Sequence, residues 1–97
     1  MEELYSDNNE RSSRYIRANI DRENLMIELQ DIGPLVEEFW GDSDYESGFT
    51  VKKADIKSVL KIKSDEELFR ELKNMYNDSQ AFDNLLNFCV ANNIKSY

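Results

Sequence analysis

Apolar side chains recur every three to five residues through most of the chain, which is the spacing of an amphipathic helix. Between residues 13 and 32 the recurring apolar positions are Tyr15, Ile16, Ile20, Leu25, Met26, Leu29 and Ile32. Ser12 and Ser13 precede this run, and a serine hydroxyl is a good N-cap because it accepts a hydrogen bond from the first turn of a helix. We therefore predict a helix here, broken near residues 19–24, and a flexible N-terminus over residues 1–12.

Four further helices are predicted in the rest of the chain. Pro34 suits the first position of a helix that ends at Gly41, and the polar stretch 42–50 that follows is typical of a loop. A short helix over 53–61 comes next. Ser64 and Glu67 have the spacing of a capping box, which starts a helix over 65–76. The last helix covers about 80–92.

The predicted fold class is therefore all-α, with four to five short helices. The only strand candidate in this interpretation is the short run 49–51. Ninety-seven residues correspond to one domain, which we place at 13–97. It contains a first helix-loop-helix at 32–61 and a second at 64–92.

Composition excludes several function classes. Lys and Arg number 12 against 20 Asp and Glu, and a net charge of −8 opposes direct binding to nucleic acid or to an anionic membrane. There is no His for a zinc site or a His-based catalytic triad, and the three glycines do not have phosphate-loop spacing. Cys89 has no partner for an internal disulfide, and the apolar residues beside it favour a buried, inert thiol. We expect a noncatalytic cytoplasmic protein.

A weak internal repeat carries the only family resemblance. Trp40 and Tyr76 both close a predicted helix and lie 36 residues apart, as do Val36 and Leu72. The segments LVEEFWGDSDYESGFTVKKADIKSVL and SDEELFRELKNMYNDSQAFDNLLNFC, within residues 32–92, resemble a diverged EF-hand pair, as in one lobe of calmodulin or a myosin light chain. This resemblance implies an EF-hand-pair-like single lobe.

The metal-binding part of that resemblance is degenerate. A calcium loop has about 12 residues, with acids at its first positions, Gly at the sixth and Glu at the twelfth. The candidate ligands in the first loop are Asp42, Asp44, Glu46 and Asp55. Phe49 falls at the sixth position, and the second loop, 77–84, is about four residues short of that length. We therefore expect no cofactor, with calcium as the only candidate.

The resemblance implies a protein-binding module that grips a basic amphipathic helix, such as that of a myosin neck, largely independently of calcium. Its apolar groove would contain Phe39, Trp40, Leu60, Leu72, Met75, Tyr76, Leu86 and Phe88. One alternative is a small acidic inhibitor, possibly phage-encoded, that mimics nucleic acid and binds a DNA- or RNA-binding protein. A helical bundle that only dimerises is a third hypothesis.

Overall fold

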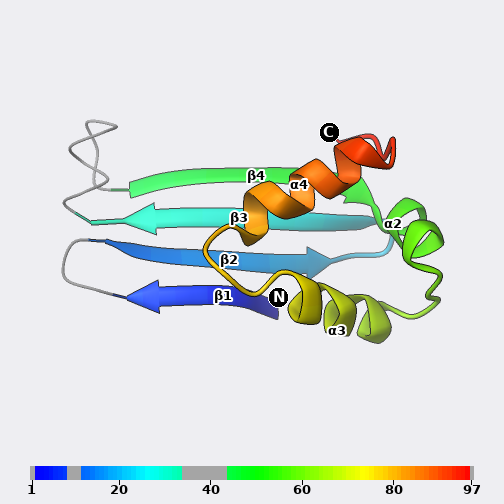
Figure 1. Cartoon of the computed structure of the whole chain (residues 1–97), viewed down its shortest axis with the longest axis horizontal. Coiled ribbons are helices and arrows are strands. Elements are labelled where there is room, and N and C mark those ends of the chain that lie inside the picture. Colours follow the sequence, from blue (N-terminus) through cyan, green and yellow to red (C-terminus); the bar gives the residue numbers. More distant parts are fainter. Residues whose placement is uncertain (1, 9–11, 34–43, 97) are drawn as a thin grey trace.

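The fold is mixed α/β and not all-α. The computed structural model describes residues 2–8, 12–33 and 44–96. Four strands come first, β1 (Glu2–Asn8), β2 (Ser13–Ile20), β3 (Asn24–Ile32) and β4 (Asp44–Lys52), and they form an antiparallel sheet in chain order. The helices α2 (Lys53–Leu60), α3 (Asp65–Met75) and α4 (Ala81–Ala91) follow; α4 crosses one face of the sheet, and α2 and α3 lie toward its right-hand end in Figure 1. The prediction of an EF-hand pair is therefore wrong.

Strands β2 and β3 replace the helix predicted over residues 13–32. Ile16 and Ala18 are buried on β2, and Leu25, Ile27 and Leu29 are buried on β3. Every second side chain thus faces the helices, which is the period of a strand. The helical interpretation was wrong because it passed over Ala18 and counted apolar residues from both faces of the sheet.

A tight turn joins these two strands. The Asp21 carboxylate accepts hydrogen bonds from the backbone N–H groups of Glu23 at 2.8 Å and Asn24 at 2.7 Å. An Asp side chain that bonds the backbone two or three residues on favours a turn over a continued helix. These two bonds also hold the pKa of Asp21 below its usual value.

The predicted first helix-loop-helix, 32–61, contains an extended strand where a calcium loop was expected. In β4, Phe49 and Val51 are buried against the helices, whereas Asp44, Glu46 and Gly48 are exposed. Glu2–Asn8, expected in a flexible terminus, form the edge strand β1, with an irregularity between Glu3 and Tyr5. β4 thus alternates buried and exposed residues over its second half with a period of two, whereas β1 buries only Leu4.

The helices of the second half match their predicted ranges closely. The Ser64 hydroxyl accepts a hydrogen bond from the Glu67 N–H at 3.1 Å and donates to the Glu67 carboxylate at 3.1 Å, so Ser64 is the N-cap of α3. One apolar core joins the sheet to the helices; its largest fully buried members are Ile16, Leu25, Ile27, Val51, Ile56, Leu68, Leu72, Leu85 and Cys89. Within the described ranges, no helix is long and apolar enough to cross a membrane.

Candidate functional site

The predicted groove residues have different environments. Phe39 and Trp40 lie outside the described residues. Leu72 is fully buried in the core and Tyr76 is nearly so, whereas Met75 is 47% exposed. Leu60, Leu86 and Phe88 are half-buried at the edges of the core. The fold thus brings several of these residues to the helical side of the molecule, but no EF-hand groove gathers them.

The candidate metal ligands do not converge. Asp44 and Glu46 lie at the start of β4 and Asp55 lies in the first turn of α2, while Asp42 is outside the described residues. The extended strand between Asp44 and Asp55 separates their backbones by roughly 30 Å. In the part of the chain that the structure describes, no group of three or more Cys, Asp or Glu side chains is arranged to hold a metal ion.

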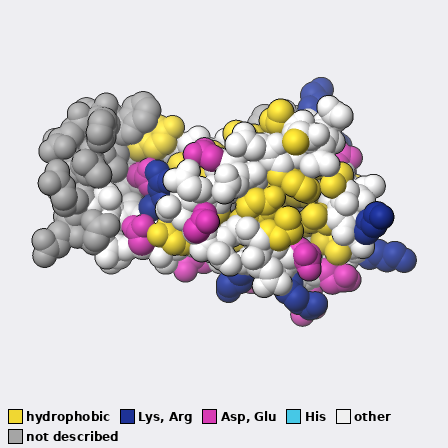
Figure 2. All heavy atoms as spheres, in the orientation of Figure 1, with side chains coloured by type: hydrophobic (Ala, Val, Ile, Leu, Met, Phe, Trp, Pro, Cys, Tyr) yellow, Lys and Arg dark blue, Asp and Glu magenta, His cyan; other side chains and the backbone are white. Residues whose placement is uncertain are grey.

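The helical side carries an apolar surface between α3 and α4. Tyr76, directly after α3, contacts Phe88 of α4 edge to face, with ring centroids 6.4 Å apart. Phe69 lies two helical turns before Tyr76 on the same side of α3 and is also half-buried. We call Phe69, Tyr76 and Phe88 the helical patch. Figure 2 shows apolar side chains gathered in this region of the molecular surface.

Beside the helical patch, Cys89 is fully buried. Burial raises the pKa of its thiol to about 11, because a thiolate would lose its hydration in the core. Burial also raises the pKa of Tyr76, and a charged Cys89 would raise it further. A thiol that stays protonated is a poor nucleophile. Cys89 is therefore a core residue, as the sequence indicated, and not a reactive group.

The opposite side of α4 carries a second apolar surface. Phe82 contacts Phe49 of β4, with ring centroids 5.3 Å apart, so this side of α4 faces the β4 strand. Leu86 and Val90 lie one and two turns beyond Phe82 on the same side. Leu86 is half-buried and Val90 is 67% exposed. We call Leu86 and Val90 the α4 stripe.

A charged cluster fixes the turn before α4. Arg14 of β2 forms a bidentate pair with Asp31 of β3, at 2.7 Å for both bonds, and donates to the Ser79 carbonyl at 2.8 Å. The hydrogen bonds to Asp31 raise the pKa of Arg14, so the guanidinium stays charged. Because Ser79 lies in the turn between α3 and α4, Arg14 ties the start of α4 to the sheet.

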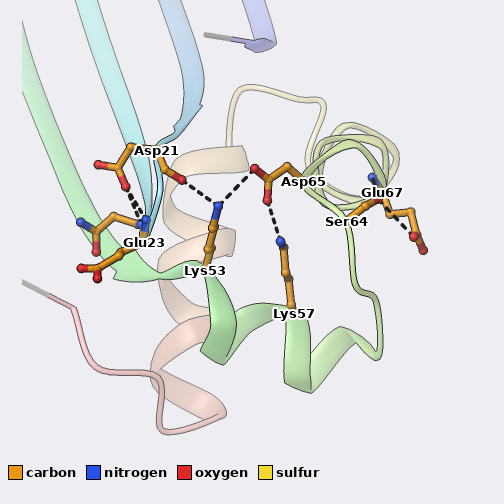
Figure 3. Close-up of polar contacts among 8 residues, drawn as sticks. Asp21, Glu23, Lys53, Lys57, Ser64, Asp65 and Glu67 are labelled. Carbon is orange, nitrogen blue, oxygen red and sulfur yellow. Dashed lines mark hydrogen bonds and ion pairs between the residues drawn. The ribbon is translucent and has the colours of Figure 1, made fainter.

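A second cluster fixes α2 and α3 at the other end of the sheet. Lys57 donates to Asp65 at 2.6 Å, and Lys53 donates to Asp65 at 3.2 Å and to the Asp21 carbonyl at 2.8 Å (Figure 3). Lys57 and then Lys53 lower the pKa of Asp65. These contacts join the β2–β3 turn to the first turn of α3. Both clusters therefore position helices, and their charged groups already have partners.

The sheet face opposite the helices carries a shallow hollow of about 430 Å³. Arg17, Glu28, Gln30 and Glu46 line it, and Gly48 forms part of its floor. A Cβ at Gly48 would lie 3.1 Å from the Ile27 carbonyl oxygen, so any other residue here would have to shift the strand. The Arg17 guanidinium lies 5.0 Å from the centroid of the Tyr15 ring. Charges of both signs in an open hollow do not indicate a particular ligand.

The described residues contain no buried polar or charged side chain, so the core holds no preorganised acid, base or nucleophile apart from Cys89. The most distinctive features are instead the helical patch and the α4 stripe. No family model, no curated protein and no solved structure matches this chain.

Sequence reasoning missed the α4 stripe as a separate surface. The signal was present, because eight of the eleven residues of α4 are apolar and only Asp83 is charged. Four of those eight, Ala81, Phe82, Leu85 and Cys89, are buried. The other four apolar residues of α4 lie outside this buried set, so α4 has more apolar residues than one core face of a surface helix requires.

Proposed function

We propose that this protein is a noncatalytic protein-binding module whose helical patch receives an amphipathic helix from a partner. The observation that carries the proposal is the apolar contact surface between α3 and α4, where Phe69 and Phe88 are half-buried beside Tyr76. Aromatic groups that are only partly buried, as Phe69 and Phe88 are, can anchor a protein interface, because a partner that covers them removes further apolar area from water.

A basic partner is favoured by the net charge of −8. The attraction to a basic partner acts at long range and comes from the net charge of the whole chain. α3 itself carries both acidic and basic side chains, such as Glu66 and Lys73, outside its core face. Electrostatic attraction would therefore speed association, whereas burial of the helical patch would supply most of the affinity. A reducing compartment such as the cytoplasm suits a protein whose single cysteine is buried.

A direct test uses a designed amphipathic helix of about 20 residues, or ~30 Å, built from Leu and Lys, as the binding probe. We expect the full chain to bind this peptide and the Phe69→Ala variant to bind it about tenfold more weakly. Val90→Ala is the matched control, because Val90 is exposed on the other side of α4. Isothermal titration calorimetry would measure both dissociation constants.

Two results would contradict the proposal. One is an absence of binding by the native chain to the Leu–Lys helix at any calcium concentration. The other is equal binding by the Phe69→Ala and Val90→Ala variants, provided that circular dichroism shows both to be folded.

A second candidate function is the acidic inhibitor. The observation in its favour is that Asp44 and Glu46 are exposed two residues apart on an end strand, and thus about 7 Å apart along it. A protein that imitates a phosphate backbone should lose its partner steeply as salt rises, because its contacts are ionic. Binding to a basic protein that falls with Asp44→Asn and Glu46→Gln, and is unchanged by Phe69→Ala, would favour this function.

A further inference from the structure

The outer edge of β4 is the starting point for a second interaction. β4 is an end strand of the sheet, and of the described residues only Ser96 forms a bridge to its outer edge, at Val51. The strand from residue 44 to residue 50 precedes that bridge. An end strand offers backbone N–H and C=O groups to another strand, and the antiparallel Val51–Ser96 bridge occupies one position of this edge.

The two end strands differ in their capacity to pair with a copy of themselves. If β1 paired antiparallel with a second β1 about its midpoint, Tyr5, Glu3 would lie opposite the partner's Asp7. Like charges directly opposite one another destabilise a strand pair. The irregularity between Glu3 and Tyr5 opposes regular pairing as well. Pairing of β1 about its midpoint is therefore disfavoured.

β4 has one register that avoids these conflicts. If two antiparallel copies of β4 paired about Glu46, the two Glu46 carboxylates would lie opposite each other. Pairing about Gly48 would require the outer edge of Val51, where Ser96 already forms a bridge. Centring on Ser47 uses only residues 44–50. It places Tyr45 opposite the partner's Phe49 on the helix-bearing face, and Glu46 opposite the partner's Gly48 on the other face. Aromatic cross-strand pairs of this kind stabilise a sheet.

The charges at the two ends of β4 complement each other in this register. Thr50 lies opposite the partner's Asp44, so Lys52, two residues further on the same face, becomes the diagonal neighbour of that carboxylate. Both side chains are exposed, and the twofold symmetry creates the contact twice. The two Glu46 side chains are diagonal neighbours across the axis, which is the one unfavourable charge contact in this register.

The α4 stripe extends the same surface. Phe82 packs on Phe49, and Leu86 lies one turn beyond it on the β4 side of α4. The partner's Tyr45 would pair with Phe49 and so come next to Leu86. Val90, 67% exposed, continues the apolar surface along the helix. A second chain at the β4 edge would thus cover side chains that the core of one chain leaves in water.

We propose that a second copy of this chain docks at the β4 edge, with the two β4 strands antiparallel about Ser47 and the two sheets continuous across the interface. The contact is isologous, so it closes as a twofold dimer. This inference goes beyond the proposed function and uses the opposite side of α4 from the helical patch. The dimer would present two helical patches, and a partner with two target helices would gain avidity from it.

The decisive experiment is a charge exchange measured by sedimentation equilibrium on the full chain. Asp44 and Lys52 are eight residues apart on one extended strand, or ~27 Å, too far to interact within a chain. We expect Asp44→Lys and Lys52→Asp each to weaken the dimer by about tenfold, because each converts two attractive contacts into repulsive ones. The double variant D44K/K52D should restore the native dissociation constant.

The matched control is Glu2→Lys, which makes the same charge change on an exposed residue of β1, the strand at the opposite end of the sheet. It should leave the dimer unchanged, and Glu46→Gln should strengthen it. A monomer at every concentration would overturn the proposal. A dimer that D44K and K52D weaken without rescue by the double variant would overturn it too.

Disulfide cross-linking tests the register directly. Ser47→Cys would bring two thiols face to face on the axis, with Cα atoms ~5 Å apart, which a disulfide can span. We expect this variant to form a linked dimer faster than Ser6→Cys, which places a thiol on the exposed β1 strand. Equal rates of cross-linking for the two variants would contradict the β4 interface. None of these outcomes depends on binding at the helical patch.

Discussion

Helices α3 and α4 have the same length but different surfaces. Six of the eleven residues of α3 are charged, against one of eleven in α4. Ser64 caps α3 through its side chain, whereas no side chain caps α4 at Gln80. α3 therefore has the composition of a helix that faces water on its outer side. α4 is held by the sheet and the Arg14 anchor, and its excess of apolar residues leaves Leu86 half-buried and Val90 exposed.

The largest expected effect tests whether both helices depend on the core for their stability. Leu72 of α3 and Leu85 of α4 are both fully buried. We expect Leu72→Ala and Leu85→Ala each to lower the free energy of unfolding by about 2–5 kcal/mol, because each leaves a cavity among packed side chains. Urea denaturation followed by circular dichroism would measure both. A loss below ~1 kcal/mol for Leu85→Ala would mean that the sheet does not hold α4.

The second prediction concerns the buried thiol of α4. Because the pKa of Cys89 rises from 9.0 to about 11 on folding, the unfolded chain loses this proton first as the pH rises. The thiol thus contributes full stability below pH 9, and we expect about 2 kcal/mol of it to be lost by pH 11.

The measurement is the difference in unfolding free energy between the native chain and Cys89→Ala at pH 8 and pH 11. The difference should shrink at the higher pH, since the alanine variant lacks this titration. A difference that does not change with pH would show that the thiol has an ordinary pKa. Tyr76, whose pKa is raised by burial, is present in both proteins, so the comparison reduces its influence.

A smaller effect is expected at the helix starts. Ser64→Ala removes the hydroxyl that accepts the Glu67 N–H, and we expect it to lower the free energy of unfolding by about 1 kcal/mol. Gln80→Ala should change it by only a few tenths, because Gln80 makes no side-chain cap bond. The same urea experiment tests both variants. Equal losses for the two would remove the contrast in capping between α3 and α4.

The smallest effect is expected at the α4 stripe. Val90→Lys should change the free energy of unfolding by less than ~0.5 kcal/mol, because the side chain is exposed in the folded monomer. This should be measured at a protein concentration where the chain is monomeric. A large loss of stability would place Val90 in the core of the monomer and would remove the α4 stripe as an unoccupied surface.

The second half of the chain was largely predictable because its signals are local. The Ser64–Glu67 capping box lies within four residues, and Leu68 and Leu72 repeat at helical spacing. The buried state of Cys89 was also expected from the apolar residues on either side of it. These features depend on residues within one or two turns of each other, so a single sequence contains them.

The sheet was not predicted, because both faces of its strands carry some apolar residues. Met26 and Ile32 face away from the helices, and together with the buried Leu25 and Leu29 they imitate a spacing of three to four residues. The EF-hand resemblance was a coincidence, because residues 44–52 of its first segment form strand β4, whereas its second segment forms helices α3 and α4. The candidate site was only partly predictable from the sequence. Phe88 was expected at the groove, but its contact with Tyr76 depends on how the two helices pack.

The sequence alone determined the three helices of the second half, the excess of negative charge and the burial of Cys89. Tertiary structure decided which face of each strand the core covers, since register is set by hydrogen bonds to strands elsewhere in the chain. It also decided that Leu72 is buried while Val90 is exposed. Helical spacing identifies an apolar side chain, but only packing against the sheet determines whether water or protein covers it.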